Sequence, residues 1–224
     1  NEVLVNNTIT VNRRKNNAGN GQVAVTLAYK VAAEIGSLGD NIIFLRWQVK
    51  NDDILHTLVN FSCDYHTVLC HTRWASIGAI TEPNCHPVDN KTQDISDSQD
   101  GIIHVCLNGD IDNYLELKTE LEARGRIIHE EIGTDTKIIP LQVQEYITRG
   151  HDIETAFRMA VNDFDGSHAI SMHTDIAPGK LFLAQKGSGQ TVFIGLAEDH
   201  MMPASEVYGF VEETPYYLKM DGEK

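Results

Sequence analysis

The sequence has little positive charge, no long apolar run and no paired cysteine motif. Its 224 residues include 18 Lys and Arg against 32 Asp and Glu, which gives a formal net charge of −14. Nucleic-acid binding depends largely on basic residues that neutralise phosphates, so we expect no nucleic-acid partner. No apolar stretch approaches the roughly 20 residues that span a bilayer and no signal peptide is visible, so we expect no membrane association.

The cysteines are few and scattered. The sequence has four, with no C-x-x-C pair: Cys63, Cys70, Cys85 and Cys106. In a chain of this size, scattered cysteines without a C-x-x-C pair indicate reduced thiols and a cytoplasmic protein. Three N-x-S/T sequons begin at Asn6, Asn60 and Asn90. They would be glycosylated only in a secreted protein, and we interpret them as chance matches.

Two Cys-His pairs, Cys70-His71 and Cys85-His86, lie fifteen residues apart. Thiolates and imidazoles are zinc ligands, so a zinc site is one interpretation. The spacing is not that of a zinc finger, and adjacent residues of a strand point to opposite faces. We therefore expect no metal, and we interpret both histidines as packed and hydrogen-bonded parts of the scaffold.

The first seventy residues give a weak pattern. Val3 to Val11 alternates like a strand, and residues 12–17 are typical of an exposed loop. Val23 to Ala33 is apolar enough for a buried strand or a short helix, and Ile42 to Val49 is either extended or helical. Periodicity alone does not decide between these alternatives. We interpret the segment that ends at Leu69 as rich in β-structure.

The pattern becomes clearer after Cys70. Ile102 to Leu107 is β-branched and apolar, which predicts a buried strand, and Asn108-Gly109 predicts a turn directly after it. Three helices and one short strand are expected next. The first helix is capped by Asp112, carries an apolar stripe of Tyr114, Leu117 and Leu121, and stops at Gly125. The short strand Ile127-Ile128 follows. The second helix is capped by Thr134 or Asp135 and ends near Gly150, and the third covers Ile153 to Asn162.

Short segments bounded by Gly or Pro follow Gly166 and predict strands. They are His168 to Met172, Lys180 to Gln185, Thr191 to Ile194, Val207 to Val211 and Tyr216 to Met220. Strands, then helices, then strands in one chain favour a layered α+β fold. With no repeat and no low-complexity linker, we expect residues 1–224 to form a single domain.

Residues 71–78, with the sequence His-Thr-Arg-Trp-Ala-Ser-Ile-Gly, carry a guanidinium, an indole and a hydroxyl on one short segment. The planar fork of Arg73 suits a carboxylate ligand. The alternative is structural, because a Trp usually belongs to a core and an Arg often lies over it.

Two further segments also allow both a chemical and a structural interpretation. The side-chain amide of Asn108 and the backbone N–H of Gly109 would supply two donors to a tetrahedral oxyanion, although Asn-Gly also serves as a plain turn. Asp135, after Gly133-Thr134, would receive the ammonium group of an amino acid, although an Asp at a helix start is also an ordinary N-cap. With Arg73, Asp135 would bind both charged ends of a zwitterion.

Together with Asn84-Cys-His-Pro, these segments resemble the class II glutamine amidotransferase domain of the N-terminal-nucleophile hydrolases. The resemblance extends from about Ala24 to Glu223 and is specific between Cys70 and Lys137. The most similar branch is the glutaminase domain of glutamine–fructose-6-phosphate aminotransferases. It implies a four-layer αββα sandwich that hydrolyses glutamine to glutamate and ammonia without a cofactor. A sugar-isomerase domain, absent from these residues, would pass the ammonia to fructose 6-phosphate, and a homo-oligomer is one possible assembly.

The resemblance also implies roles for individual residues. In the family, the corresponding Arg and Asp hold glutamine and the Asn-Gly pair forms the oxyanion hole. By this resemblance, Arg73 binds the carboxylate of glutamine, Asp135 binds its amino group, and Asn108 and Gly109 stabilise the oxyanion. Ser76 replaces a family Thr that contacts the substrate, and Trp74 lies near glutamine.

The chain departs from the family at the nucleophile. Family members attack with an N-terminal Cys whose α-amino group acts as the base. This chain begins with Asn1, and the family's Arg-Gly-x-Asp-Ser-x-Gly loop is absent before Val23. Either an upstream segment carries the nucleophile, or the protein binds glutamine without hydrolysing it; an α+β module without a ligand is a third alternative.

Three smaller departures occur inside the matching segments: Ile77 and Leu107 replace family histidines, and Lys137 replaces a Glu. They leave Arg73 and Asp135 in place, which favours the enzyme over the non-catalytic relative.

Overall fold

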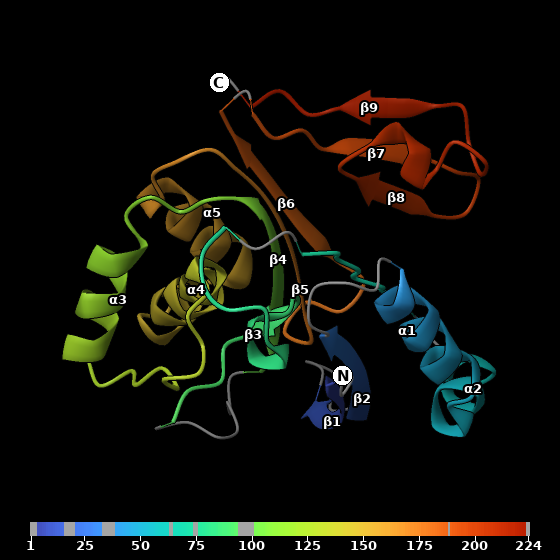
Figure 1. The fold of residues 1–224 in the computed structure, drawn as a ribbon, viewed down its shortest axis with the longest axis horizontal. Coiled ribbons are helices and arrows are strands. Elements are labelled where there is room, and N and C mark those ends of the chain that lie inside the picture. The colour runs from blue at the N-terminus through green and yellow to red at the C-terminus, as the bar shows by residue number, and fades with distance from the viewer. Residues whose placement is uncertain are drawn as a thin grey trace.

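The computed structural model describes residues 4–15, 21–32, 39–62, 65–73, 76–93, 101–187 and 189–222. Figure 1 shows helices and antiparallel sheets, the α+β class that the order of elements predicts. Within these ranges the strands belong to three sheets. The first is a hairpin of β1 (Leu4–Lys15) and β2 (Gly21–Ala32).

The second sheet lies at the centre of the fold and has the strand order β3-β4-β5-β6. Its strands are β3 (Val88–Asp89), β4 (Ile103–Gly109), β5 (His168–Thr174) and β6 (Leu181–Lys186). β4 pairs with β5 from Ile103 opposite Thr174 to Gly109 opposite His168. The first five residues of β4 are buried, as their apolar and β-branched character predicts.

The third sheet is smaller, with the order β8-β7-β9. Its strands are β7 (Phe193–Leu196), β8 (Met201–Ala204) and β9 (Tyr217–Lys219).

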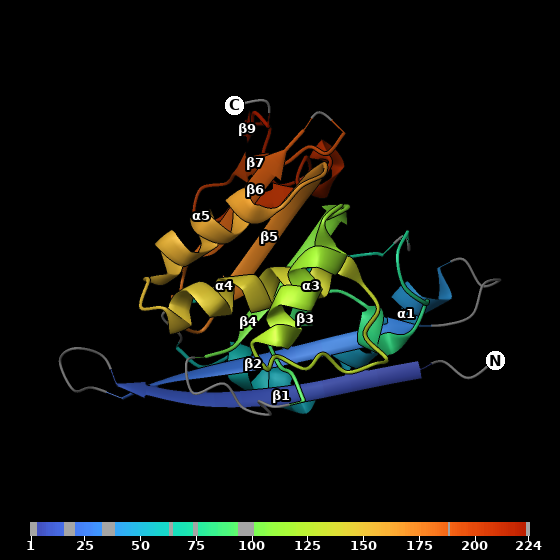
Figure 2. The same cartoon turned by 90° about the vertical axis from the view of Figure 1, so that its left-hand side faces the viewer.

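Three helices cover one face of the second sheet: α3 (Tyr114–Ala123), α4 (Ile138–Thr148) and α5 (Ile153–Asp163). They lie together on the left of Figure 1, and Figure 2 shows them in front of β4 and β5. Their apolar side chains form one buried core with those of β4 and β5. Removing this apolar surface from water is the main force that holds the helices on the sheet.

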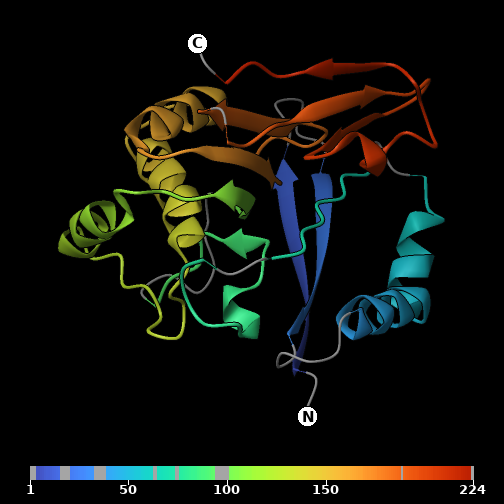
Figure 3. The same cartoon turned by 45° about the horizontal axis from the view of Figure 1, so that its top comes forward.

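The β1–β2 hairpin and two N-terminal helices lie on the opposite face of that sheet, and the third sheet lies at the top of Figures 1 and 3. From left to right, Figures 1 and 3 show α3 to α5, the second sheet, the β1–β2 hairpin, and the helices α1 (Asp40–Lys50) and α2 (Asp53–Val59). This succession of helix, sheet, sheet and helix agrees with the expected four-layer αββα arrangement. No helix among the described residues combines the length and apolar character needed to cross a membrane.

The N-terminal predictions are correct only in part. β1 continues through Asn12 to Lys15, which the sequence assigned to a loop, because each of these residues pairs with β2. β2 and α1 decide two open alternatives in favour of a strand and a helix. The expected β-rich run before Leu69 is wrong: α2 occupies Asp53–Val59, where Asp52 accepts a hydrogen bond from the Leu55 N–H and caps the helix.

The later elements follow the predictions more closely. The buried strand after Ile102, all three helices, and strands near His168, Lys180, Thr191 and Tyr216 are present. Their apolar periodicity is strong, and most of these helices and strands contribute to the buried core.

Four local assignments are wrong. The N-cap of α3 is Asn113 rather than Asp112, and Asn108 and Gly109, which were expected to form a turn, pair with β5 as the last two residues of β4. Thr134 is the N-cap of the 3-10 turn that leads into α4, as one of the two expected alternatives, although its side chain makes no capping hydrogen bond. Ile127-Ile128 is not a strand. Residues Val207–Gly209 form a 3-10 turn where a strand was expected, and β8 was not predicted.

We expect Leu121→Ala to lower the free energy of unfolding by about 2–5 kcal/mol, because it leaves a cavity in the core. Leu121 is fully buried in α3, whereas Leu115 of the same helix is 62% exposed. The control Leu115→Ala should change stability by no more than about 0.5 kcal/mol. Urea denaturation measures both, and equal losses would contradict the assignment of the buried face of α3.

Candidate functional site

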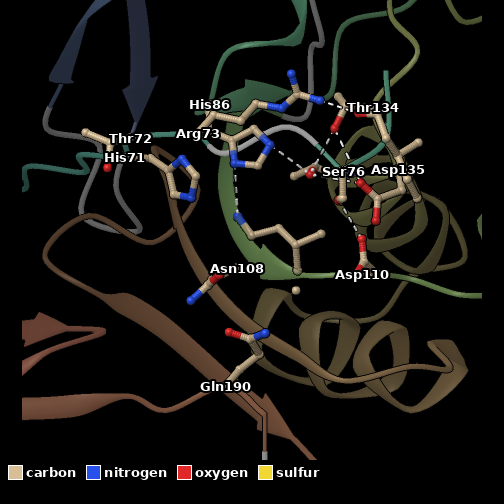
Figure 4. A pocket seen from close by; sticks show the side chains of 14 residues that line it. His71, Thr72, Arg73, Ser76, His86, Asn108, Asp110, Thr134, Asp135 and Gln190 are labelled. Carbon is tan, nitrogen blue, oxygen red and sulfur yellow. Dashed lines mark hydrogen bonds between the residues drawn. The ribbon is translucent and has the colours of Figure 1, made fainter. Parts of the chain in front are cut away.

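A cavity of about 270 Å³ lies at the end of β4, between that strand and the loops around it. Figure 4 shows its lining side chains. They come from five parts of the chain: residues 71–73 with 76 and 77, His86, residues 107–110, residues 134–136, and Gln190. Five of the six site residues predicted from the sequence are among them: Arg73, Ser76, Asn108, Gly109 and Asp135. The sixth, Trp74, lies outside the described residues.

A glycine allows two of the motif segments to approach each other. Gly78 has a φ of +83°, and a Cβ at this position would lie 2.9 Å from the carbonyl carbon of Gly133 and 3.1 Å from the backbone nitrogen of Thr134. Any side chain would therefore separate the Arg73 segment from the Asp135 segment.

Asn84 also holds the turn at Gly133 and Thr134 in place. Its Oδ1 accepts hydrogen bonds from the N–H groups of Gly133 and Thr134 at 2.8 and 3.0 Å. Its Nδ2 donates to the Glu131 carbonyl and to Thr81 Oγ1. All four bonding positions of this buried amide are used, so the Asn-Cys-His-Pro motif begins with a residue that orders the Asp135 turn.

His86 links the turn to β4. Its Nδ1 accepts the Leu107 N–H at 3.4 Å, and its Nε2 lies 2.9 Å from Thr136 Oγ1. Because Nδ1 accepts a backbone N–H, a neutral ring carries its proton on Nε2 and donates to Thr136. The expectation that His86 is packed and hydrogen-bonded is confirmed.

His71 packs on His86, with ring centroids 4.4 Å apart. Burial lowers the pKa of both rings, and lowers that of His86 to about 3, helped by the neighbouring His71 and by the positive charges of Arg73 and Lys30. Both rings are therefore neutral at physiological pH. His71 is packed as expected, but its Nδ1 has no hydrogen-bond partner among the described residues.

Asp135 is buried, with only 4% of its surface exposed. Its Oδ2 accepts the Ile111 N–H at 2.9 Å and its Oδ1 the Thr136 N–H at 2.8 Å. Burial raises the pKa of this carboxyl group, assisted by the negative charge of Asp110, while these two N–H bonds oppose the rise. The side chain thus ties its turn to the end of β4.

Arg73 also has structural partners. Its guanidinium donates to the carbonyl of Ala79 at 3.1 Å and to the carbonyl of Ile77. These bonds hold the side chain against the backbone at Ile77 and Ala79. A guanidinium has five N–H donors, so further donors remain for an anion in the cavity.

Asn108 is exposed, and its side-chain amide forms no hydrogen bond to another described residue. Gly109 has a φ of +105°, and a Cβ there would lie 2.1 Å from the Ser167 carbonyl oxygen. Backbone packing alone therefore requires glycine at this position. The free amide of Asn108 is the donor that this corner presents to the cavity.

Asp110 and Gln190 are two of the lining residues that were not predicted as site residues. Asp110 accepts a hydrogen bond from Ser76 Oγ at 2.7 Å, and Gln190 reaches the cavity from the β6–β7 connection (Figure 4). The adjacency of Asp110 to Asn108-Gly109 was a local signal for the first. Nothing in the sequence near Gln190 indicates its position, which depends on how β6 and β7 pack.

The three departures from the family pattern have distinct surroundings. Ile77 and Leu107 line the cavity, where they present apolar surface. Lys137 is buried and points elsewhere: its Nζ donates to the Asp89 carbonyl at 2.7 Å and forms an ion pair with Oδ1 of Asp89 at 3.2 Å. Lys137 thus anchors the 3-10 turn Asp135–Lys137 to β3.

None of the described cysteines, Cys70, Cys85 and Cys106, lines the cavity. Burial raises the pKa of all three thiols, most strongly that of Cys106. Nucleophilic thiols have a lowered pKa, so these three groups are poor nucleophiles at neutral pH. Within the described ranges, no three His, Cys, Asp or Glu side chains gather in a way that could hold a metal ion.

Residues 83–212 match the family described as glutamine amidotransferase domain. The chain is 33% identical over 153 residues to a glutamine–fructose-6-phosphate aminotransferase (isomerizing) of Methanothermobacter thermautotrophicus, a match over 68% of this chain and 24% of that protein. It is 36% identical over 157 residues to the protein of the same name from Sulfolobus acidocaldarius, over 69% of this chain and 24% of that one. The chain thus spans about a quarter of the length of these relatives.

A solved structure of glutamine phosphoribosylpyrophosphate amidotransferase from B. subtilis is similar in fold. The TM-score is 0.53 at 23% identity, and the match covers 66% of this chain and 29% of that one.

The lowered pKa of His86 predicts a pH-dependent stability. Between about pH 6.5 and 3 the unfolded chain binds a proton at this residue and the folded chain does not, so the free energy of unfolding falls as the pH falls. The full contribution of one such group is about 1.4 kcal/mol per pH unit. His86→Gln should lose this contribution. The difference in free energy of unfolding between the wild type and this variant should therefore become smaller as the pH falls from 6 to 4.

Chemical denaturation at several pH values measures this difference. Thr136→Val is the matched control, because it removes the Nε2 partner but keeps the imidazole; it should lower stability by a constant amount and retain the wild-type slope. Parallel curves for His86→Gln and the wild type would show that His86 is not the titrating group.

Proposed function

Because the chain belongs to the glutamine amidotransferase domain family, we propose that residues 1–224 act as one glutaminase domain that hydrolyses glutamine to glutamate and ammonia. One observation carries the proposal: Arg73, Asn108, Gly109 and Asp135, which come from three separate segments, line a single cavity. Opposite charges and an amide donor around one small space are what a zwitterion with a side-chain amide requires.

The size of the cavity supports a small ligand. Pockets for drug-sized molecules occupy roughly 300–1,000 Å³. The 270 Å³ here lie just below that range and suit a free amino acid. In the proposed complex, Arg73 binds the α-carboxylate, and Asp135 attracts the α-ammonium group.

The corner at the end of β4 then receives the amide. Attack by a thiol on the amide carbon of glutamine moves an electron pair onto its oxygen. When the carbonyl re-forms, the nitrogen takes up the proton that the thiol gave up and leaves as ammonia, and water then hydrolyses the thioester to glutamate and restores the thiol. Asn108 donates to the oxyanion from its side chain, together with the backbone at Gly109. Donors held in place before the reaction stabilise such charge strongly, because they need not reorganise.

The attacking group is not one of the three described cysteines, which lie outside the cavity and have raised pKa values. The proposal therefore assigns the attacking thiol to another residue, in the manner of the family's N-terminal Cys.

The names of the relatives support fructose 6-phosphate as the acceptor of the ammonia. We propose that the ammonia passes to fructose 6-phosphate in aminosugar synthesis, with a sugar-isomerase domain as the partner, and that this occurs in the cytoplasm. Reduced cysteines in the described part of the chain agree with that compartment.

A second candidate function is glutamine binding without hydrolysis. The cysteine chemistry favours it, because the cavity contains no thiol from the described residues. The two candidates share the same binding contacts and differ only in ammonia release.

Arg73→Ala should weaken glutamine binding by about 10- to 100-fold, because a charge-assisted interaction with the α-carboxylate is lost. Isothermal titration calorimetry measures the dissociation constant, and Arg73→Lys should retain part of the affinity through its charge. The control Arg124→Ala removes only an exposed pair with Glu120 on α3 and should bind like the wild type. Unchanged affinity in a folded Arg73→Ala variant would remove Arg73 from the site.

Asn108→Ala should lower the rate of ammonia release by about 10²- to 10³-fold, because an oxyanion donor is lost. Glutamine affinity should change less, since the amide oxygen carries little charge before attack. Ammonia release and calorimetry on the same samples separate the two effects. Wild-type protein that binds glutamine but releases no ammonia would favour the non-catalytic candidate.

A further inference from the structure

The proposed glutamine clamp gives the ammonium group a single partner, Asp135, and that carboxylate is nearly saturated with hydrogen bonds. Besides the two backbone N–H groups, the hydroxyls of Thr134 and Thr136 lie 3.4 and 3.5 Å from Oδ1. Two carboxylate oxygens offer about four acceptor positions. With 4% of its surface exposed, Asp135 has little capacity left for an ammonium group with three N–H donors.

Asp110 is the more accessible carboxylate of the same cavity. It is half-buried, and its Oδ1 accepts a single hydrogen bond from Ser76 Oγ. No described residue donates a hydrogen bond to its Oδ2. Its backbone N–H donates to the Ser167 carbonyl at 3.1 Å, which fixes where the residue leaves β4.

The two carboxylates are neighbours. The N–H of Ile111, the residue after Asp110, donates to Asp135 Oδ2. The negative charge of Asp110 contributes to the raised pKa of Asp135, after burial as the main cause. Figure 4 shows both side chains on the same side of the cavity.

We propose that Asp110 is a second ligand of the substrate's α-ammonium group, which lies between Asp110 and Asp135. This inference rests on the proposed function. It adds a binding residue to the cavity and gives that residue a role in specificity.

The charges of the cavity explain that role. Arg73 contributes one positive charge, Asp110 and Asp135 contribute two negative charges, and the neutral His71 and His86 contribute none. The lining therefore has a net charge of about −1 when both carboxylates are ionised. Glutamine is neutral overall, whereas glutamate carries an additional negative charge that this lining repels. Asp110 thus favours binding of the amide substrate and release of the acid product.

Calorimetry with three ligands tests the proposal: glutamine, glutamate, and glutaramate, which is glutamine without its α-amino group. Asp110→Asn keeps the acceptor for Ser76 and removes only the charge. It should bind glutamine about tenfold more weakly, since a charge-assisted hydrogen bond becomes a neutral one. Glutaramate affinity should stay the same or increase, and the preference for glutamine over glutamate should become smaller.

Asp112→Asn is the matched control, because Asp112 is exposed two residues further on and does not line the cavity. It should behave like the wild type with all three ligands. Asp110→Glu retains the charge and should recover part of the glutamine affinity, which confirms that charge rather than shape is responsible.

Two results would overturn the inference while leaving the proposed function intact. One is wild-type or higher glutamine affinity in Asp110→Asn. The other is an equal loss for glutamine and glutaramate, which would place the effect on Ser76 and the loop rather than on the ammonium group. If the wild-type protein bound no glutamine at all, the proposed function and this inference would both fail.

Discussion

Residues 134–136 of the turn after Gly133 are buried against the end of β4, and the shape of the cavity depends on that contact. Three kinds of interaction hold it there: the close approach of Gly78 to Gly133, the hydrogen bonds of Asn84, and the Asp135 carboxylate that accepts the Ile111 N–H. Buried N–H groups are costly to leave unpaired, so loss of any of these contacts would release the turn. The opposite charges in the cavity keep their separation only while this turn is in place.

His86 extends this network by a chain of hydrogen bonds that runs from the Leu107 N–H to the Asp135 carboxylate. The Leu107 N–H donates to His86, His86 donates to Thr136, and Thr136 lies beside the Asp135 carboxylate. A chain of donors that ends at an anion is mutually reinforcing. Because burial keeps both imidazoles neutral, the chain keeps its direction across the physiological pH range. These hydrogen bonds connect the end of β4 at Leu107 to the Asp135 carboxylate.

Several residues of the proposed site serve the fold as well as the chemistry. Gly109 is required by the contact with Ser167, Arg73 closes its own loop through Ile77 and Ala79, and Asp135 fixes its turn. The structural and the chemical interpretations of these residues are thus compatible rather than alternatives. Asn108 differs, because its amide has no partner among the described residues and its exposure has no structural explanation here.

Local signals in the sequence were sufficient for the elements and residues whose roles depend on their neighbours in the chain. The apolar run of β4 and the apolar stripe of α3 are of this kind. At Asp53–Val59 the prediction was wrong although a local signal was present, because Asp52 accepts the Leu55 N–H and caps α2, none of whose residues is buried. At Val207–Gly209 a 3-10 turn replaces the expected strand. By itself, the sequence determined which charged and polar groups are available to line a binding site. Only the tertiary structure decided that Gln190 shares the cavity with them and that Asp110 accepts a hydrogen bond from Ser76, because both depend on contacts between segments that are 34 or more residues apart.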